Sequence, residues 1–179
     1  MAEGILKEKW IQGVALTTTI LAVCAAIASL KATSYSTKVQ LSTTQEANGW
    51  AYFQAKNIRE NLYKMQADAF KLNLMQGPKD PKVEKFLADR IKKYEAEVAR
   101  YSEERAKIKA DTENIQKQQA LFKKHNASFA LSVMVLQIAI MMSAVGALVK
   151  KPLMWIVGLA FGAVGLFLML NGFYLWMEV

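Results

Sequence analysis

Three long apolar runs constrain this chain more than any other feature. They occupy residues 10–30, 126–149 and 152–177, and none of them contains Asp, Glu, Lys or Arg. An α-helix rises about 1.5 Å per residue and a bilayer's hydrocarbon core is about 30 Å thick, so roughly 20 apolar residues suffice to cross it. The sequence therefore predicts three transmembrane helices. The length of the first run favours a retained anchor over a cleaved signal.

Residues 31–125, between the first two runs, are rich in charge and interrupted by a cluster of helix breakers. Gly77 can adopt the left-handed conformation that ends a helix, and Pro78 cannot continue one. Asp80 is a good N-cap, and Pro81 suits the first helical position. The pattern predicts that one helix ends here and another begins, as in a helical hairpin.

The predicted tip at residues 76–81 lies between two legs that both show steps of four and three residues, the heptad period of a coiled coil. If the legs fold back on each other, residues equally distant from Pro78 meet. The predicted seam pairs Ile58 with Val98, Leu62 with Tyr94, Met65 with Ile91, and Ala69 with Leu87. Ser and Thr are frequent in residues 31–49, which leaves open whether the first leg is one unbroken helix. The expected fold is an all-α membrane protein with a long antiparallel coiled-coil hairpin between its first and second spans.

Residues outside this predicted seam supply candidate contacts between subunits. Contiguous exposed aromatic side chains tend to mark an interface, and glycines at helical spacing let helices approach closely in lipid. The aromatic set is Trp50, Tyr52, Phe53, Tyr63 and Phe70, and the glycine set is Gly158, Gly162, Gly165 and Gly172. Two alternatives stay open: the aromatic side chains pack on the opposite leg, or the glycines pack helices of a single chain.

The sequence offers no reactive constellation. Its single histidine, His125, and single cysteine, Cys24, do not form a metal-ligand set, and no phosphate-binding loop or nucleophile motif is present. Gln137 and Asn171 are amide side chains well inside the apolar runs, where such groups hydrogen-bond neighbouring helices or constrict a pore. We expect no enzymatic activity, no cofactor and no metal.

The charge pattern bears on partners and on orientation. The formal net charge is +8, but the signs are interleaved along residues 31–125, and without a basic stripe a nucleic-acid partner is not expected. An anionic lipid or an acidic protein partner remains open. Lys150 and Lys151 join the last two spans, and Lys7 and Lys9 lie in the short arm of residues 1–9. The positive-inside rule then places this side in the cytoplasm, with the hairpin and the C-terminus outside.

Three stretches resemble a known family. They are "WIQGVALTTTILAVCAAIASLKA" in the first span, "NGWAYFQAKNIRENLYKMQ" on the first leg, and "QIAIMMSAVGALVKKPLMWIVGLAFGAVGLF" across the last two spans. The most specific element is Trp50-Ala51-Tyr52-x-Gln54-Ala55-Lys56. Together they resemble a bacterial family of small inner-membrane proteins described as a domain of unknown function. The resemblance implies one span, a charged helical hairpin and two further spans in the bacterial inner membrane. It implies no activity, and the acidic, His-rich N-terminal arm of many members does not appear in residues 1–9.

These features favour a non-enzymatic integral membrane protein that homo-oligomerises through its hairpin and its spans as a scaffold. Two alternatives stay open: an oligomeric channel, and a sensor or adaptor that binds a partner through the hairpin.

Overall fold

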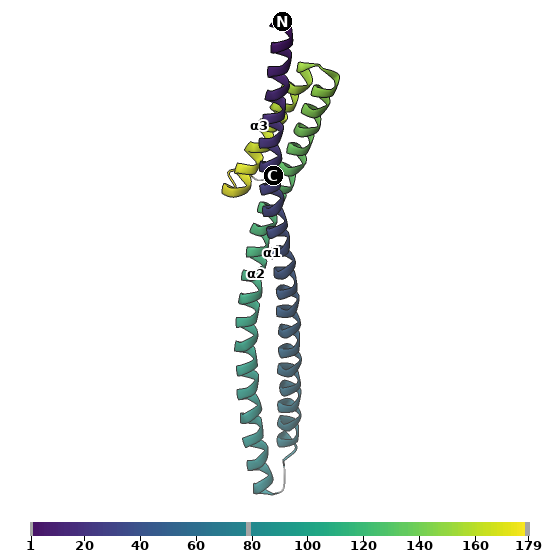
Figure 1. The fold of residues 1–179 in the computed structure, drawn as a ribbon. Coiled ribbons are helices and arrows are strands. Elements are labelled where there is room, and N and C mark those ends of the chain that lie inside the picture. Colours follow the sequence, from purple (N-terminus) through teal and green to yellow (C-terminus); the bar gives the residue numbers. More distant parts are fainter. Residues whose placement is uncertain (1, 78–79, 178–179) are drawn as a thin grey trace. The chain divides into compact units, whose positions relative to one another are not determined.

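The computed structural model describes residues 2–77 and 80–177. Within these ranges the chain forms three helices and no strand: α1 (Ala2–Met75), α2 (Pro81–Val149) and α3 (Pro152–Tyr174) (Figure 1). Each of these helices contains a segment long and apolar enough to cross a membrane. The predicted all-helical class is therefore confirmed. Helix α1 runs without a break through residues 31–49, which settles the point that the sequence left open.

The ends of α1 and α2 follow local backbone chemistry. Gly77 follows the last turn of α1 with a φ of +70°, in the left-handed region that glycine adopts without strain. At the start of α2, the backbone N–H of Lys82 donates to Asp80 Oδ1 at 2.8 Å, so Asp80 caps the helix and Pro81 is its first residue. Pro78, the centre of the predicted tip, lies outside the described residues.

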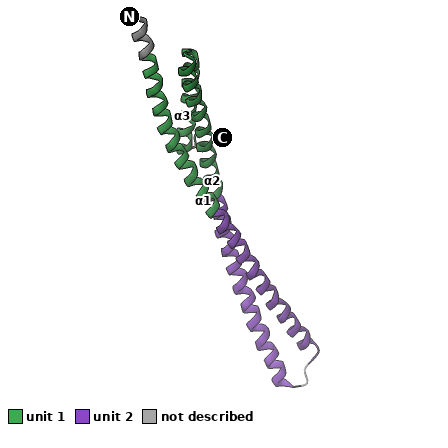
Figure 2. Ribbon diagram, turned by 45° about the vertical axis from the view of Figure 1, so that its right-hand side comes forward, with its two compact units in different colours: residues 1–41, 119–179 green, residues 42–118 purple. Residues whose placement is uncertain are grey.

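The chain divides into two compact units (Figure 2). Unit 1 contains Met1–Leu41 and Gln119–Val179, and unit 2 contains Ser42–Gln118. Unit 1 thus includes α3 and the apolar parts of α1 and α2, whereas unit 2 includes only charged, amphipathic parts of α1 and α2.

The centre of unit 1 is a small apolar core. It consists of Leu21 and Ala25 of α1 with Leu136 and Ala139 of α2, and Leu166 of α3 packs against it. These are small or aliphatic side chains, so the three helices meet through close packing rather than through charge.

The glycines of α3 are part of this packing. A Cβ atom at Gly158 would lie 2.9 Å from the backbone oxygen of Ala139, and one at Gly165 would lie 2.7 Å from Leu136 Cγ. The other two glycines of the set, Gly162 and Gly172, approach Leu21 and Phe129, and all four are buried. Their prediction as an interface between subunits is therefore wrong. Because glycine lacks a side chain, these positions bring α3 close to α1 and α2 of its own chain.

The two amides predicted as intramembrane contacts have different surroundings. Asn171 is fully buried: its Nδ2 donates to Ser128 Oγ at 3.3 Å and to the Met177 backbone oxygen at 2.9 Å, and its Oδ1 accepts from the Met177 N–H at 2.8 Å. The asparagine thus ties α2 to the chain that leaves α3, where Leu175 takes a left-handed conformation. The helix consequently ends at Tyr174, before the predicted limit at residue 177. Gln137, in contrast, is exposed on α2.

Candidate self-association surface

Helix α1 of unit 2 presents two different heptad stripes, one toward α2 and one away from it. The first, here the inner stripe, contains residues that are buried or half-buried. Its members are Ser42, Glu46, Gly49, Phe53, Lys56, Glu60, Tyr63, Ala67, Phe70 and Leu74. Their spacing alternates between four and three residues, which is the period expected of a helix face that follows a partner helix.

Aromatic rings of the inner stripe contact α2. The ring of Tyr63 lies 5.6 Å from those of both Tyr94 and Tyr101 of α2, and the ring of Phe70 lies 5.6 Å from that of Tyr94. Farther along α1, the guanidinium of Arg105 lies 5.4 Å from the centroid of Phe53. Aromatic pairs and cation–π contacts of this kind each add to the energy of area burial. Tyr63, Phe70 and Phe53 are therefore used within the chain.

Ion pairs add to the contact between α1 and α2. Lys56 Nζ lies 2.6 Å from Glu104 Oε2, and Lys71 Nζ lies 2.8 Å from Glu95 Oε1. Glu60 is 2% exposed, and its carboxylate lies between Lys64 Nζ at 2.6 Å and Arg105 Nε at 3.4 Å. A buried carboxylate needs such partners, because an unpaired charge at this position would be costly.

These ion pairs shift the pKa values of their members. The hydrogen bond to Lys56 lowers the pKa of Glu104, and the same bond raises the pKa of Lys56. The Glu95 carboxylate likewise raises the pKa of Lys71 through its hydrogen bond. Both shifts of the Lys56–Glu104 pair favour the charged forms, so this pair is an ion pair at neutral pH.

The second stripe of α1, here the outer stripe, contains Ala51, Ala55, Ile58, Leu62, Met65, Ala69 and Leu72. It also has heptad spacing, but every member is exposed, with exposed fractions of 58% for Ile58, 53% for Leu62 and 69% for Met65. The prediction that Ile58, Leu62, Met65 and Ala69 face α2 is therefore wrong. The face of α2 that was paired with them does lie against α1: Leu87 is buried, and Ile91, Tyr94 and Val98 are half-buried. The inner stripe of α1 is what meets it.

The prediction that the aromatic set forms an interface between subunits is wrong for the side chains that pack against α2. Tyr63, Phe70 and Phe53 belong to the inner stripe, and Trp50 is half-buried with its ring 5.6 Å from that of Phe53 in an edge-on arrangement. Tyr52 alone of the five is more than half exposed, with Lys56 Nζ 5.1 Å from its centroid. Tyr63, Phe70 and Phe53 thus contribute to the contact between α1 and α2, whereas Tyr52 remains exposed.

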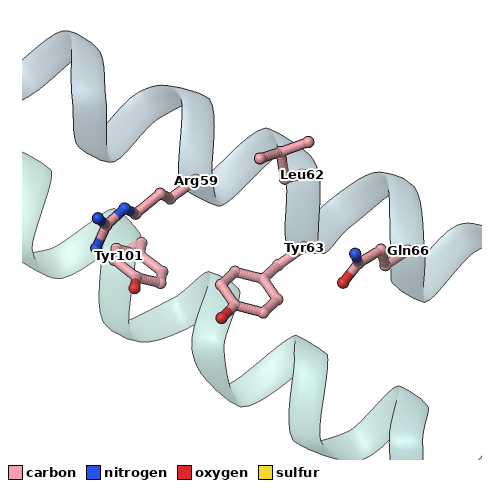
Figure 3. A pocket seen from close by; sticks show the side chains of 5 residues that line it. All are labelled: Arg59, Leu62, Tyr63, Gln66 and Tyr101. Atoms are coloured by element: carbon pink, nitrogen blue, oxygen red, sulfur yellow. The ribbon is translucent and has the colours of Figure 1, made fainter.

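A shallow pocket of about 260 Å³ lies beside the outer stripe (Figure 3). Arg59, Leu62, Tyr63, Gln66 and Tyr101 line it. Leu62 points away from α2, whereas Tyr63 points toward it, and the guanidinium end of Arg59 lies near the ring of Tyr101 (Figure 3). The pocket therefore joins an exposed aliphatic side chain to aromatic rings and to polar groups, a combination common at the centre of protein interfaces.

The outer stripe has the chemistry of a surface that binds another helix. In the parts of the chain that the structure describes, no group of three or more His, Cys, Asp or Glu side chains is placed to hold a metal ion. The outer stripe provides apolar area with helical periodicity. The binding partner that matches such a surface best is another amphipathic helix. Its flanking positions are mostly uncharged: Gln54, Asn61 and Asp68 on one side, and Arg59, Gln66 and Asn73 on the other.

Fold and surface together define an all-helical protein with helices of membrane-spanning length and an amphipathic helical segment between the first two apolar runs. The family is shown by sequence comparison: residues 10–175 match Domain of unknown function (DUF4337). The chain belongs to this family, which confirms the resemblance seen in the sequence. Comparison with curated proteins gives no match, and neither does comparison with solved structures.

Proposed function

We propose that this chain is a non-enzymatic, multipass protein of the bacterial inner membrane that homo-oligomerises as a membrane scaffold. Residues 31–125 form an antiparallel coiled-coil hairpin outside the bilayer, and the outer stripe of α1 is the face through which copies of the chain associate. The observation that carries the proposal is the exposure of that stripe. A heptad series of aliphatic side chains is left without a partner on a helix whose opposite side is already packed.

Membrane insertion is supported by the surface of unit 1. Large apolar side chains are exposed around its apolar helices, including Leu16 (64%) and Ile20 (52%) on α1, and Ile156 (57%) and Val164 (52%) on α3. Water-soluble monomers rarely expose so much apolar surface, whereas lipid tails would cover it at no cost.

The membrane constrains how two copies meet. All copies insert with the same orientation, so copies side by side in one membrane are related by an axis along the membrane normal, and their α1 helices run parallel. In a parallel heptad pair the flanking residues of one helix meet those of the other. Here these residues are amides apart from Arg59 and Asp68, so they create no like-charge repulsion.

The outer stripe resembles the core of a coiled coil only in part. Ile58, Leu62, Met65 and Leu72 supply large side chains, but Ala51, Ala55 and Ala69 supply small ones. Removing apolar area from water is worth about 25 cal/mol per Å², so a stripe with several alanines gives a modest association energy. Tethering in the membrane raises the local concentration of the copies, which makes a modest contact sufficient.

The proposal is tested by the mass of the full-length protein in mild detergent, measured by light scattering. We expect an oligomer for the natural chain and a shift toward the monomer for a double variant, Ile58→Lys with Leu62→Lys, which places charges in the outer stripe. The matched control is Val83→Lys with Phe86→Lys. These side chains are also exposed and apolar, at 45% and 53%, but lie on α2 of the same unit. A monomeric natural chain, or equal loss of mass in both variants, would contradict the proposal.

A channel is a second candidate because of Gln137. This amide is exposed on the apolar part of α2, where lipid offers no hydrogen-bond partner. In an oligomer the glutamines of several copies bond to one another or line a polar path. Conductance of purified protein in planar bilayers, reduced by Gln137→Leu, would support this function, and a silent bilayer would remove it.

A further inference from the structure

The pocket beside the outer stripe has the geometry of a hole in a coiled coil. Four of its lining residues belong to α1 and stand at positions i, i+3, i+4 and i+7: Arg59, Leu62, Tyr63 and Gln66. Residues at this spacing surround a side chain of the facing helix in knobs-into-holes packing. Tyr101 of α2 lines the same pocket, so the hole opens at the groove between the two helices of unit 2 (Figure 3). A side chain that fills it has to come from a third helix.

The aromatic floor of the pocket is held in place by packing. The rings of Tyr63 and Tyr101 are stacked, with centroids 5.6 Å apart and an interplanar angle of 17°. Lys56 Nζ lies 5.1 Å from the Tyr101 centroid, and the guanidinium carbon of Arg100 lies 4.8 Å from it. Tyr101 is 5% exposed. An apolar side chain that enters the pocket therefore contacts rings that are already ordered, which keeps the entropic cost of binding low.

Polar groups mark the two ends of the pocket. Arg59 and Gln66 are seven residues apart on α1, and both are exposed. Within residues 2–77 and 80–177, Arg59 forms no ion pair with a carboxylate. The guanidinium of Arg59 and the amide nitrogen of Gln66 are hydrogen-bond donors. A helix that fills the pocket therefore matches it best when it presents oxygen acceptors seven residues apart.

The outer stripe of α1 presents this pattern around Met65. Met65 is 69% exposed, and Asn61 and Asp68, at positions i−4 and i+3 from it, are seven residues apart and carry side-chain oxygens. In a parallel copy displaced by two residues, about 3 Å along the helix, Asn61 lies beside Arg59 and Asp68 beside Gln66. The same displacement brings Met65 over the pocket. Its flexible, polarisable thioether fills irregular gaps and makes favourable contacts with aromatic rings.

We propose that this pocket binds the Met65 side chain of a second copy of the chain. Asn61 and Asp68 of that copy accept hydrogen bonds from Arg59 and Gln66 at the two ends of the pocket. The contact rests on the self-association proposed above and names its second surface. The outer stripe of one copy packs into the groove between α1 and α2 of the next, rather than against the outer stripe alone.

The test compares Met65→Glu with Met65→Lys in the full-length protein. Both variants remove the apolar side chain, but Glu would face Arg59 of the next copy as an opposite charge and Lys as a like charge. The dissociation constant of the oligomer is measured by energy transfer between labelled copies diluted in mild detergent. We expect the Glu variant to associate about tenfold more tightly than the Lys variant. Adding Arg59→Gln to each should remove most of that difference.

Leu72, another exposed member of the outer stripe, is the matched control. Leu72→Glu and Leu72→Lys should respond equally to Arg59→Gln. Equal association of the two Met65 variants, or a difference between them that persists without Arg59, would overturn the proposed contact. If the natural chain is still an oligomer that Ile58→Lys with Leu62→Lys disrupts, self-association stands and only the contact at the pocket falls. A monomeric natural chain would remove both proposals.

Discussion

Asn171 shows how one polar side chain inside an apolar helix determines local structure. Its amide bonds to Ser128 on α2 and to both backbone groups of Met177, and it has no solvent exposure. The sequence singled out the residue as a hydrogen-bonding amide but could not name its partners, because the chain reversal at Leu175 brings Met177 back to it. The sequence makes the same prediction for Gln137, another amide inside an apolar run, but the side chain of Gln137 is exposed.

Replacing Asn171 with Leu should destabilise unit 1. The change leaves the Met177 N–H and the Ser128 hydroxyl without this partner, and leaving a buried polar group unsatisfied costs about 1–3 kcal/mol. Thermal unfolding in detergent, followed by circular dichroism, measures the loss. Gln137→Leu is the control and should leave the midpoint unchanged or raise it; a larger loss for Gln137→Leu than for Asn171→Leu would contradict the assignment.

The Lys56–Glu104 pair predicts a dependence of stability on pH. The pKa of Glu104 is lowered from 4.5 by its hydrogen bond to Lys56, so the pair contributes fully above pH 4.5 and its contribution is lost as the pH falls through the lowered value. The pKa of Lys56 is raised from 10.5, so at the alkaline end the contribution is lost only as the pH rises through the raised value.

The unfolding midpoint of the full-length protein should therefore fall on acidification below pH 4.5, and Lys56→Met should make that fall shallower. Lys109→Met serves as the control, since its Nζ lies 3.8 Å from Glu113 on the same helix and both side chains are about half exposed. If the control flattens the profile as much as Lys56→Met does, the pair does not carry this pH dependence.

Among the helices, α1 is the one whose packing face could not be predicted from the sequence. The helices themselves followed from run length and from the breakers near Gly77, and the inward face of α2 followed from its heptad spacing. On α1, however, two stripes have the same spacing, and the inner one contains Lys56 and Glu60, which a search for apolar residues passes over. These two side chains form ion pairs with Glu104 and Arg105 of α2, and only the folded structure shows such partners.

Gly158 tests the packing of α3 as an element. Alanine is the better helix former by about 1 kcal/mol, so the local effect of Gly158→Ala is favourable. The added methyl group would nevertheless lie 2.9 Å from the backbone oxygen of Ala139, which cannot rotate away, so α3 must move from α2. Overpacking costs about 1–3 kcal/mol, and a net loss of stability is expected in thermal unfolding.

Gly13→Ala is the matched control for this change. A Cβ atom at Gly13 would meet the Trp155 ring at 3.6 Å, which is an ordinary contact, so the variant should be as stable as the natural chain or more so. If Gly158→Ala proved the more stable of the two, α3 would not be held against α2 as described.

For the molecule as a whole, the two units have different surfaces, and the matched family has no described function to which either surface could be assigned. Unit 1 exposes apolar side chains on helices long enough to cross a membrane, and the glycines of α3 pack within the chain. Unit 2 has one packed face and one exposed heptad face on α1. In our proposal, copies of the chain therefore associate through unit 2. The α3 glycines do not contribute to this contact, because they pack against α1 and α2 of their own chain.

Orientation is the whole-molecule property that the lysines predict. Lys150 and Lys151 in the short connection between α2 and α3 predict that this end lies in the cytoplasm, because basic residues in short loops are retained there. A segment as long as residues 31–125 crosses a membrane largely regardless of its charge. The orientation can be measured by labelling single-cysteine variants made in a Cys24→Ser background. A cysteine replacing Gln76 should react with a membrane-impermeant maleimide in cells whose outer membrane has been permeabilised, and one replacing Lys151 only after the inner membrane is opened. The reverse pattern would place unit 2 in the cytoplasm, where self-association through the outer stripe would organise the inner face of the membrane instead.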